Sequence, residues 1–274
     1  MNRPIVVQQT LPSTNKIVIL PDSHAHPDFD NDRYEALGNL LLEEQATCIL
    51  NIGDFADMPS LSSYDRGRLE FEGRRYKKDI QAAHDAQRRL FKPIDAYNKK
   101  RASLRKRKFS LFTVHCLGNH DQGRINTAIS IHPELEGMIG VKDLNYEKYW
   151  NVIVPFKEVG MLNGVLFSHY FSSGVKGQPI SGENIGNSLI RKNLGSSIQG
   201  HTHTYDLKQM VCADGTVTFG LSCGCFTHPE MLYDWNANTA HMWRNCITIL
   251  HNVWEGGFDK FELLEHDYVM RRYT

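Results

Sequence analysis

The sequence contains short apolar runs that end abruptly in polar side chains. Strand-like runs of this kind occupy residues 16–20, 47–52 and 109–117, and residues 165–170 and 196–203 are expected to form two more short strands with polar ends. Between the first two runs, apolar residues recur with helical spacing over residues 33–45. Because strands that alternate with helical segments are typical of βαβ units, we expect a parallel sheet built from the first part of the chain.

The last part of the chain has a different pattern. Pairs of strand-like runs flank glycine-containing turns, at residues 206–212 with 216–223 and 247–254 with 260–265. Such pairs predict antiparallel hairpins, so we expect mixed sheets and the fold class α/β (α+β). The tryptophans of this part are expected to pack on the sheet; they are Trp235, Trp243 and Trp254.

A long polar segment, residues 65–108, separates two of the early strands. It contains sixteen Lys or Arg and six Asp or Glu, a net charge of +10, although the whole chain has a formal net charge of zero. Apolar residues at helical spacing, with Pro93 among them, predict one long kinked helix or a helical hairpin that is apolar on one side and basic on the other. A solvated charged face and a contact surface for a polyanion both fit this pattern.

Composition narrows the class of protein only a little. The chain has 274 residues with 41% hydrophobic and 23% charged residues, which is ordinary for a globular protein. No apolar run approaches the roughly 18 to 20 residues of a membrane span, and the first residues lack the core of a signal peptide. The six cysteines are scattered, which fits reduced thiols better than a disulfide framework. We therefore expect a cytoplasmic protein that does not enter the membrane.

Polar residues with metal-binding chemistry follow the early strands. They are Asp22, His24, Asp54, Asn119, His120, His169, His201 and His203. In open α/β sheets, ligands bind outside the carboxyl ends of the strands. Carboxylates and imidazoles without clustered thiolates suit a first-row divalent ion. The set exceeds the four to six donors that one ion needs, so we expect two ions, and Asp54, alone on its strand, is a natural bridging carboxylate.

The order of these motifs resembles the calcineurin-like metallophosphoesterase superfamily. Asp22-x-His24, Gly53-Asp54, the run from Gly118 to Asp121, a single His169 and the run from Gly200 to His203 occur in that order over about residues 16–205. The resemblance implies a four-layer αββα sandwich of two mixed sheets flanked by helices. It also implies a single domain over residues 1–274, with residues 65–108 as a basic helical insertion.

The resemblance also implies roles for individual residues. One metal would be held by Asp22, His24, Asp54 and His203, and the other by Asp54, Asn119, His169 and His201. His120 would face the scissile phosphate, and Asp57 would pair with it. Manganese is the metal we expect first, with iron, zinc or nickel as alternatives.

This arrangement fits the hydrolysis of a phosphate ester. Two cations neutralise the ester, make hydroxide available near neutral pH from a bridging water and orient in-line attack. His120, with the Asp57 carboxylate behind it, would then give a proton to the leaving oxygen. Arg124 is either a phosphate-binding arginine or a solvated arginine at a helix start. Asp121 is expected to cap the following helix or to support its neighbours.

Other polar residues receive a structural interpretation. His26 is taken as a loop histidine. Cys223, Cys225 and His228 are taken as residues of a strand end, because they lack a fourth ligand for zinc.

Two positions depart from the superfamily's pattern. Tyr170 stands where glycine often follows the single histidine, and Met58-Pro59 replaces the Arg-Gly of the phosphoprotein-phosphatase branch.

Three kinds of function remain open from the sequence. The first is a nuclease or phosphodiesterase that contacts DNA or RNA through residues 65–108, which the charge distribution favours. The second is a phosphatase or phosphodiesterase acting on a small molecule or phosphoprotein, with the insertion as a lid. The third is a non-enzymatic scaffold, which the complete ligand set disfavours. The fold does not choose between them.

Overall fold

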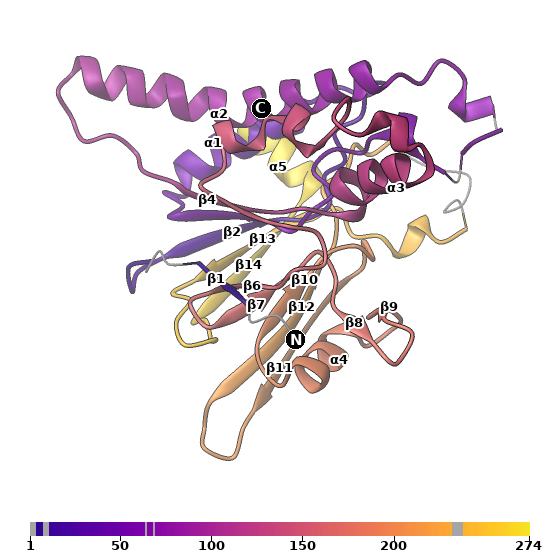
Figure 1. The fold of residues 1–274 in the computed structure, drawn as a ribbon. Helices are drawn as coiled ribbons and strands as arrows, with labels where there is room; N and C mark the ends of the chain where they lie inside the picture. Colours follow the sequence, from indigo (N-terminus) through magenta and orange to yellow (C-terminus); the bar gives the residue numbers. More distant parts are fainter. Residues whose placement is uncertain (1–3, 8–10, 64, 68, 232–237) are drawn as a thin grey trace.

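The computed structural model describes residues 4–7, 11–63, 65–67, 69–231 and 238–274. Within these residues two six-stranded mixed sheets lie face to face, and helices cover their outer faces (Figure 1). The expected fold class, an α/β sandwich of two mixed sheets flanked by helices, is confirmed.

The first sheet carries the early strands in the order β14-β13-β2-β3-β4-β5. Strands β2 to β5 are parallel, and β13 runs antiparallel to β2. Their bounds are β2 Lys16–Leu20, β3 Cys48–Asn51, β4 Phe112–Cys116, β5 Val152–Val154, β13 Cys246–His251 and β14 Lys260–Glu265. The predicted early strands and the last hairpin are therefore present in one sheet.

The second sheet has the order β1-β6-β7-β10-β12-β11. Strands β7, β10 and β12 are parallel neighbours, and β11 and β12 form the predicted hairpin. The bounds are β1 Ile5–Val6, β6 Gly160–Leu162, β7 Val165–Phe167, β10 Ser197–Gln199, β11 Tyr205–Val211 and β12 Val217–Cys223. A separate small hairpin is formed by β8 Ser172–Ser173 and β9 Gln178–Pro179.

Alternating side chains of the first sheet fill two different cores. Val18 and Leu20 of β2 face the helices, whereas Ile17 and Ile19 face the second sheet. A strand that is buried on both faces is apolar at successive positions, which explains the continuous apolar runs of the sequence. The helices are α1 Asp32–Glu43, α2 Tyr76–Ser103, α3 Arg124–Ile131, α4 Ile185–Asn193 and α5 His266–Tyr273.

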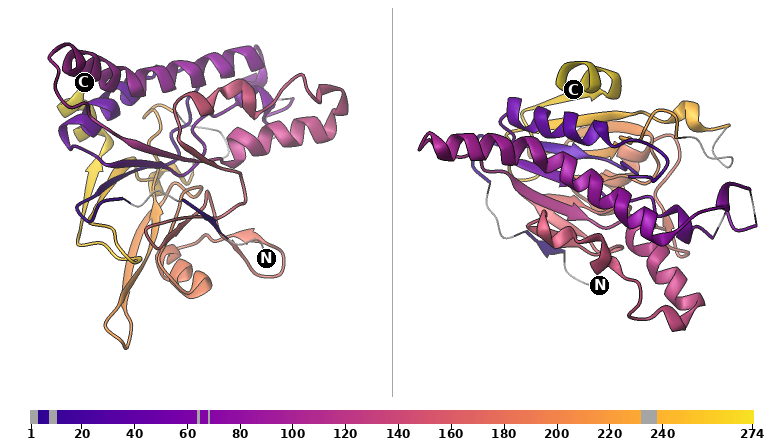
Figure 2. Two further views of the ribbon diagram at one scale, coloured as in Figure 1. Left: turned by 60° about the vertical axis from the view of Figure 1, so that its left-hand side comes forward. Right: turned by 90° about the horizontal axis from the view of Figure 1, so that it is seen from above.

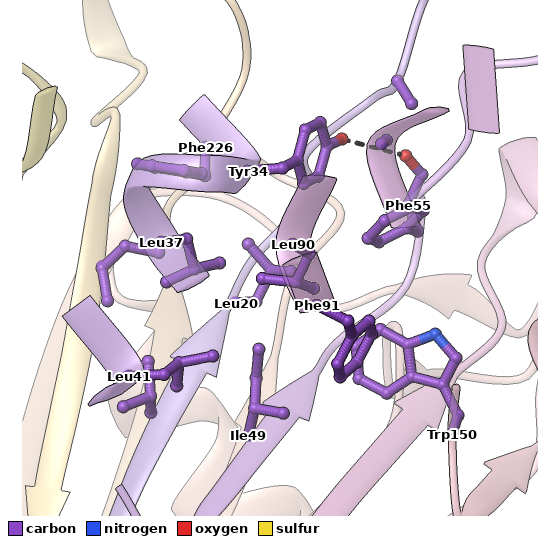
Figure 3. Close-up of a cluster of buried hydrophobic side chains, with 14 of the residues drawn as sticks. Leu20, Tyr34, Leu37, Leu41, Ile49, Phe55, Leu90, Phe91, Trp150 and Phe226 are labelled. Carbon is purple, nitrogen blue, oxygen red and sulfur yellow. Dashed lines mark hydrogen bonds between the residues drawn. The ribbon is translucent and has the colours of Figure 1, made fainter. Parts of the chain in front are cut away.

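Helix α2 packs its apolar side on α1 and on the first sheet. Figure 3 shows Leu90 and Phe91 of α2 among side chains that include Leu20 and Ile49 of the sheet. The expected insertion thus forms one long helix with Pro93 inside it. At about 1.5 Å per residue, its 28 residues span roughly 42 Å. Figure 2 shows α2 crossing the outer face of the first sheet.

Basic residues of this segment lie along the middle of α2 and at its C-terminal end. Arg89 and Lys92 form ion pairs with Asp32 and Glu35 of α1. Beyond them lies a group that we name the basic tip, which comprises Lys99, Lys100, Arg101, Arg105, Lys106, Arg107 and Lys108. Arg101 is partly exposed and the others are exposed.

The basic tip lies far from the carboxyl ends of the parallel strands. The chain enters β4 at Phe112, soon after the tip, and Asn98 accepts a hydrogen bond of 2.8 Å from the backbone of Phe109. The tip is therefore at the amino end of β4, whereas Asn119 follows its carboxyl end (Figure 1). A polyanion contact through the basic tip would therefore lie away from the candidate metal ligands, because a helix that connects parallel strands runs back along the sheet.

In the part of the chain that the structure describes, no helix is both long enough and apolar enough to cross a membrane.

Candidate metal centre

The predicted ligands converge at one edge of the sandwich from both sheets. They follow β2, β3 and β4 of the first sheet and β7 and β10 of the second. Asn119 and His120 begin a π-helical turn, Asn119–Gly123, that leads directly into α3. The structure thus brings together the expected metal-ligand set, which is Asp22, His24, Asp54, Asn119, His169, His201 and His203.

One group of ligand atoms comes from Asp22, His24 and His203. One ligand atom from each residue lies within 4.8 Å of the others, and all three side chains are buried. The Nε2 atoms of His24 and His203 are 3.2 Å apart, and His203 Nε2 lies 3.2 Å from Asp22 Oδ2. These donors are close enough together to hold one cation.

A second group contains Asp54, His169 and His201, again with ligand atoms within 4.8 Å of one another. Asn119 joins them, because its Oδ1 lies 2.7 Å from His169 Nε2 and 2.9 Å from His201 Nδ1. Asp54 Oδ2 is 3.3 Å from His169 Nε2 and 3.9 Å from His24 Nε2. Asp54 therefore lies between the two groups, in the place that a bridging ligand requires.

Partners outside the two groups orient several of these side chains. His169 Nδ1 lies 3.0 Å from the carbonyl oxygen of Ile52, which leaves Nε2 directed at the ligand group. The backbone N–H of His120 donates to Asp54 Oδ1 at 2.8 Å, so Oδ2 is the oxygen that faces the histidines. Such hydrogen bonds fix the orientation and tautomer of metal ligands.

Four of the ligands have an unusual backbone conformation. The φ angles are positive at His24, Asp54, His201 and His203, with values of 46°, 48°, 68° and 58°. The left-handed region is uncommon for residues other than glycine and costs of order 1–3 kcal/mol where it occurs. Four of the thirteen non-glycine residues with positive φ in the described part of the chain are thus candidate ligands, and the surrounding fold holds them in this conformation.

Two glycines of the motifs make room for carboxylates. A Cβ atom at Gly118 would lie 2.0 Å from Asp54 Oδ1, and one at Gly200 would lie 2.1 Å from Asp22 Oδ1. Any side chain at these positions would displace the carboxylates. Glycine is therefore required here by the close approach of two ligands to the backbone.

The electrostatics favour ionised carboxylates in the centre. Burial alone raises the pKa of Asp54, but the charges of His169 and His120 hold it well below its usual range. Burial acts in the same way on Asp22, whose pKa is lowered by its hydrogen bond with His203 and by the charge of His169. Burial lowers the pKa of His201 to about 4, which keeps its ring neutral and available as a ligand.

His169 has the opposite shift. Burial lowers its pKa, but the charge of Asp54 and the hydrogen bond with it outweigh burial and raise the pKa to about 9. Without a cation, His169 is thus the positive partner of Asp54. A bound cation would take over that charge, since a metal ligand must be a neutral imidazole.

Asp57 connects the centre to His120. Its Oδ1 lies 2.8 Å from Nδ1 of His120 and 2.8 Å from Nδ1 of His24. The Nε2 atom of His120 lies 3.9 Å from Asp54 Oδ2, so it points toward the ligand groups. The structure therefore places Asp57 behind His120 as expected, and it also places Asp57 behind the ligand His24, a contact that the sequence did not indicate.

Arg124 lies against Asp57 and not in solvent. Its Nη1 donates to the carbonyl oxygen of Asp57 at 2.7 Å and lies 3.8 Å from Oδ2, with 15% of the side chain exposed. Burial and the positive charge of Arg124 lower the pKa of His120, and the charge of Asp54 and the hydrogen bond with Asp57 offset this only in part. The Asp57 carboxylate therefore orients the His120 ring without raising its pKa above the ordinary value.

Asp121 supports the loops that carry the ligands. Its Oδ1 accepts hydrogen bonds from the backbone of Ala56 at 2.7 Å and from the hydroxyl of Tyr146 at 3.0 Å. Its Oδ2 accepts longer bonds from the backbone of Phe55 and of Gly118. Asp121 therefore joins the loop after β3 to the turn after β4, as one of the two expected roles requires.

Three residues near the centre were not assigned to it from the sequence. The Trp243 ring lies 4.1 Å from the His203 ring, centroid to centroid, a contact that the expected packing on the sheet did not include. The Tyr170 ring lies 4.9 Å from that of His201. His26 is buried with Nε2 at 3.8 Å from Asp57 Oδ2. Of these three, only Tyr170 had a sequence signal for a place near the centre, because it directly follows His169. Trp235, which was also expected to pack on the sheet, lies outside the described residues.

Comparisons with known proteins add little about function. No family model matches the sequence, and no curated protein is significantly similar to it. Solved structures do match, and one crystal structure aligns with 92% of this chain and 99% of its own chain. It shares 12% sequence identity and has a TM-score of 0.41, which is too low to support an argument.

Proposed function

We propose that this protein is a metal-dependent phosphoesterase of the calcineurin-like kind, which hydrolyses a phosphate ester at the candidate metal centre. The observation that carries the proposal is the position of Asp54 between two groups of buried ligands, with Nε2 of His120 at 3.9 Å from the same carboxylate oxygen. Two cation sites that share a carboxylate, with a histidine beside them, suit the transfer of a phosphoryl group to water.

The residues of the centre fit two divalent transition-metal ions. Asp22, His24 and His203 would hold one ion, and Asn119, His169 and His201 the other, with Asp54 shared. The donor set of imidazoles, carboxylates and one amide oxygen suits manganese, iron, zinc or nickel. In addition, the buried Asp22 Oδ1 has no hydrogen-bond partner within the described ranges, which leaves this oxygen available to a cation.

When bound, the two ions would supply neutralisation of the phosphate charge and a hydroxide nucleophile near neutral pH. His120 is placed to contact the phosphate ester through Nε2, because Asp57 occupies its Nδ1. An anionic ester next to Nε2 raises the pKa of the imidazole, so His120 gains a proton as substrate binds and can donate it to the leaving oxygen. Asp57 would hold the ring in that orientation, and Arg124 would hold Asp57.

The substrate class depends on charges outside the metal centre. The basic tip lies at the end of α2 that is distant from the metal centre. It therefore does not support a contact with nucleic acid beside the scissile bond. Arg75, Lys77 and Lys78 at the start of α2 are exposed, and the same turn contacts the loop after β3 through Asp79, which accepts a hydrogen bond from the backbone of Ser60 at 2.9 Å. These cations favour a polyanionic nucleic-acid phosphodiester, with a small-molecule or phosphoprotein ester as the second candidate.

The site of action is expected to be the cytoplasm. The structure contains no disulfide among its six cysteines, all of which are free thiols. Free thiols are typical of a reducing compartment.

Parallel assays with manganese-loaded protein test the proposal. Bis-p-nitrophenyl phosphate, p-nitrophenyl phosphate and labelled single- and double-stranded DNA report diesterase, monoesterase and nuclease activity in turn. We expect hydrolysis of at least one ester, loss of that activity in chelator and its recovery on addition of manganese. His241→Ala, which removes an exposed histidine, is the matched control for the ligand variants. Metal-loaded protein without activity on any of these esters would refute the proposed function.

A further inference from the structure

An aromatic side chain borders the second group of ligands. The Tyr170 ring lies 4.9 Å from the ring of the ligand His201 and 5.6 Å from the ring of Phe156, centroid to centroid. Phe156 in turn lies 6.1 Å from the ring of the ligand His169. Tyr170 and Phe156 are both partly exposed, and Phe156 also packs against the core, so the two rings form an aromatic rim between the core and the metal centre.

The backbone next to Tyr170 is held in place by a buried amide. Gln199 is 0% exposed; its Oε1 accepts a hydrogen bond from the backbone of Phe171 at 3.2 Å, and its Nε2 donates to the carbonyl oxygen of Ile180 at 2.8 Å. Phe171 and Ile180 are also bonded to each other and buried against α4. The base of the β8–β9 hairpin is therefore held in place, and with it the backbone next to Tyr170.

Within the described residues, the Tyr170 hydroxyl and part of its ring are left free by the fold. Its hydroxyl makes no hydrogen bond to any residue in the described part of the chain, and the ring is only partly covered by its neighbours. If the phosphate of a substrate lies at the candidate metal ligands, the group esterified to that phosphate extends along the side chains around the centre. Tyr170 lies against the imidazole of His201, so a flat group extending on this side would meet the aromatic ring.

We propose that Tyr170, supported by Phe156, stacks on a flat aromatic group joined to the scissile phosphate, and that this group is a nucleobase. The inference rests on the proposed function and narrows its substrate class to nucleotide esters. Stacking of a base on an aromatic side chain contributes about 1–3 kcal/mol, which corresponds to roughly 5- to 150-fold in affinity. It tolerates different bases, because every base has a π face.

Calorimetric titration with paired ligands tests this inference. Adenosine 5′-monophosphate and ribose 5-phosphate carry the same phosphate, and only the first carries a base. We would titrate both into manganese-loaded protein in a His120→Ala background, which slows hydrolysis during the measurement. Phenyl phosphate is the third ligand, and it separates a nucleobase from a simple aryl group.

We expect Tyr170→Ala and Tyr170→Leu to weaken adenosine monophosphate binding about 5- to 150-fold and to leave ribose 5-phosphate unchanged. Tyr170→Phe keeps the ring and should retain the wild-type affinity. Tyr268→Ala, at a residue of α5 that is 43% exposed, is the matched aromatic control and should change neither affinity. Metal content measured on every variant shows that the ligand groups are intact.

Each outcome bears on a different claim. Equal losses for both sugar phosphates, or no loss for either, would overturn the stacking inference and leave the proposed function standing. A loss for phenyl phosphate without a loss for adenosine monophosphate would overturn the nucleobase assignment. If neither sugar phosphate binds to the metal-loaded protein without a Tyr170 substitution, this inference falls, and the ester assays decide on the proposed function separately.

Discussion

Replacement of His115 by leucine should remove a defined part of the pH dependence of folding. His115 lies on β4, is 0% exposed and packs between the rings of Tyr146 and Trp150, at centroid distances of 4.1 and 4.8 Å. Neither ring nitrogen has a hydrogen-bond partner in the described residues. Burial lowers the pKa of His115 from 6.5 to about 3, because a charged imidazole would be surrounded by apolar groups.

The sign and size of the effect follow from this shift. The unfolded chain binds a proton at His115 below about pH 6.5, whereas the folded protein does not until about pH 3, so stability is lost as the pH falls through that window. Each pH unit below the unfolded pKa costs about 1.4 kcal/mol, so between about pH 8 and pH 5 this one histidine removes about 2 kcal/mol from the free energy of unfolding.

Urea unfolding at both pH values measures this contribution. The protein is first freed of metal with a chelator, because protons and metal ions compete for the ligand histidines. The wild type and His115→Leu share every other titratable group, so the difference between their pH dependences isolates His115. We expect the variant to lose about 2 kcal/mol less than the wild type on acidification. The control variant His241→Leu, at an exposed position, should behave as the wild type. Equal losses in the wild type and His115→Leu would refute the reasoning.

Four further outcomes are expected. Asp54→Asn should lower the metal content below that of the wild type by elemental analysis, because one carboxylate serves both groups; unchanged content would contradict its bridging position. Gly118→Ala should also lower the metal content, because a Cβ atom there would lie 2.0 Å from Asp54 Oδ1 and displace that carboxylate. Full metal retention in this variant would show that the loop can shift. His120→Ala should keep its metal and lower kcat about 10²- to 10⁴-fold, with a smaller loss for p-nitrophenyl esters whose leaving group needs no proton; loss of metal would make His120 a ligand. Neutralising the basic tip should leave hydrolysis of bis-p-nitrophenyl phosphate and of dinucleotides unchanged, because the tip lies at the far end of α2; a raised KM on dinucleotides would place the tip beside the substrate.

Local features of the sequence were sufficient for the strands and for the identity of the candidate ligands. A strand buried on both faces has to be apolar at successive positions, so its end is marked where Asp22, Asp54 or Asn119 follows. The glycines of the motifs are local signals as well, because Gly118 and Gly200 leave no room for a side chain beside the carboxylates. Residue type and order along the chain therefore determined which side chains could share one centre.

Tertiary structure decided how those side chains are supported and what surrounds them. Asp57 contacts both His24 and His120, and Trp243 packs on His203, only because segments distant in the sequence meet at one edge of the sandwich. The direction of α2 separated the basic tip from the metal centre, since a helix between parallel strands returns toward their amino ends. The sequence shows how many charges a segment carries, but only the path of the folded chain determines how far those charges lie from the metal centre.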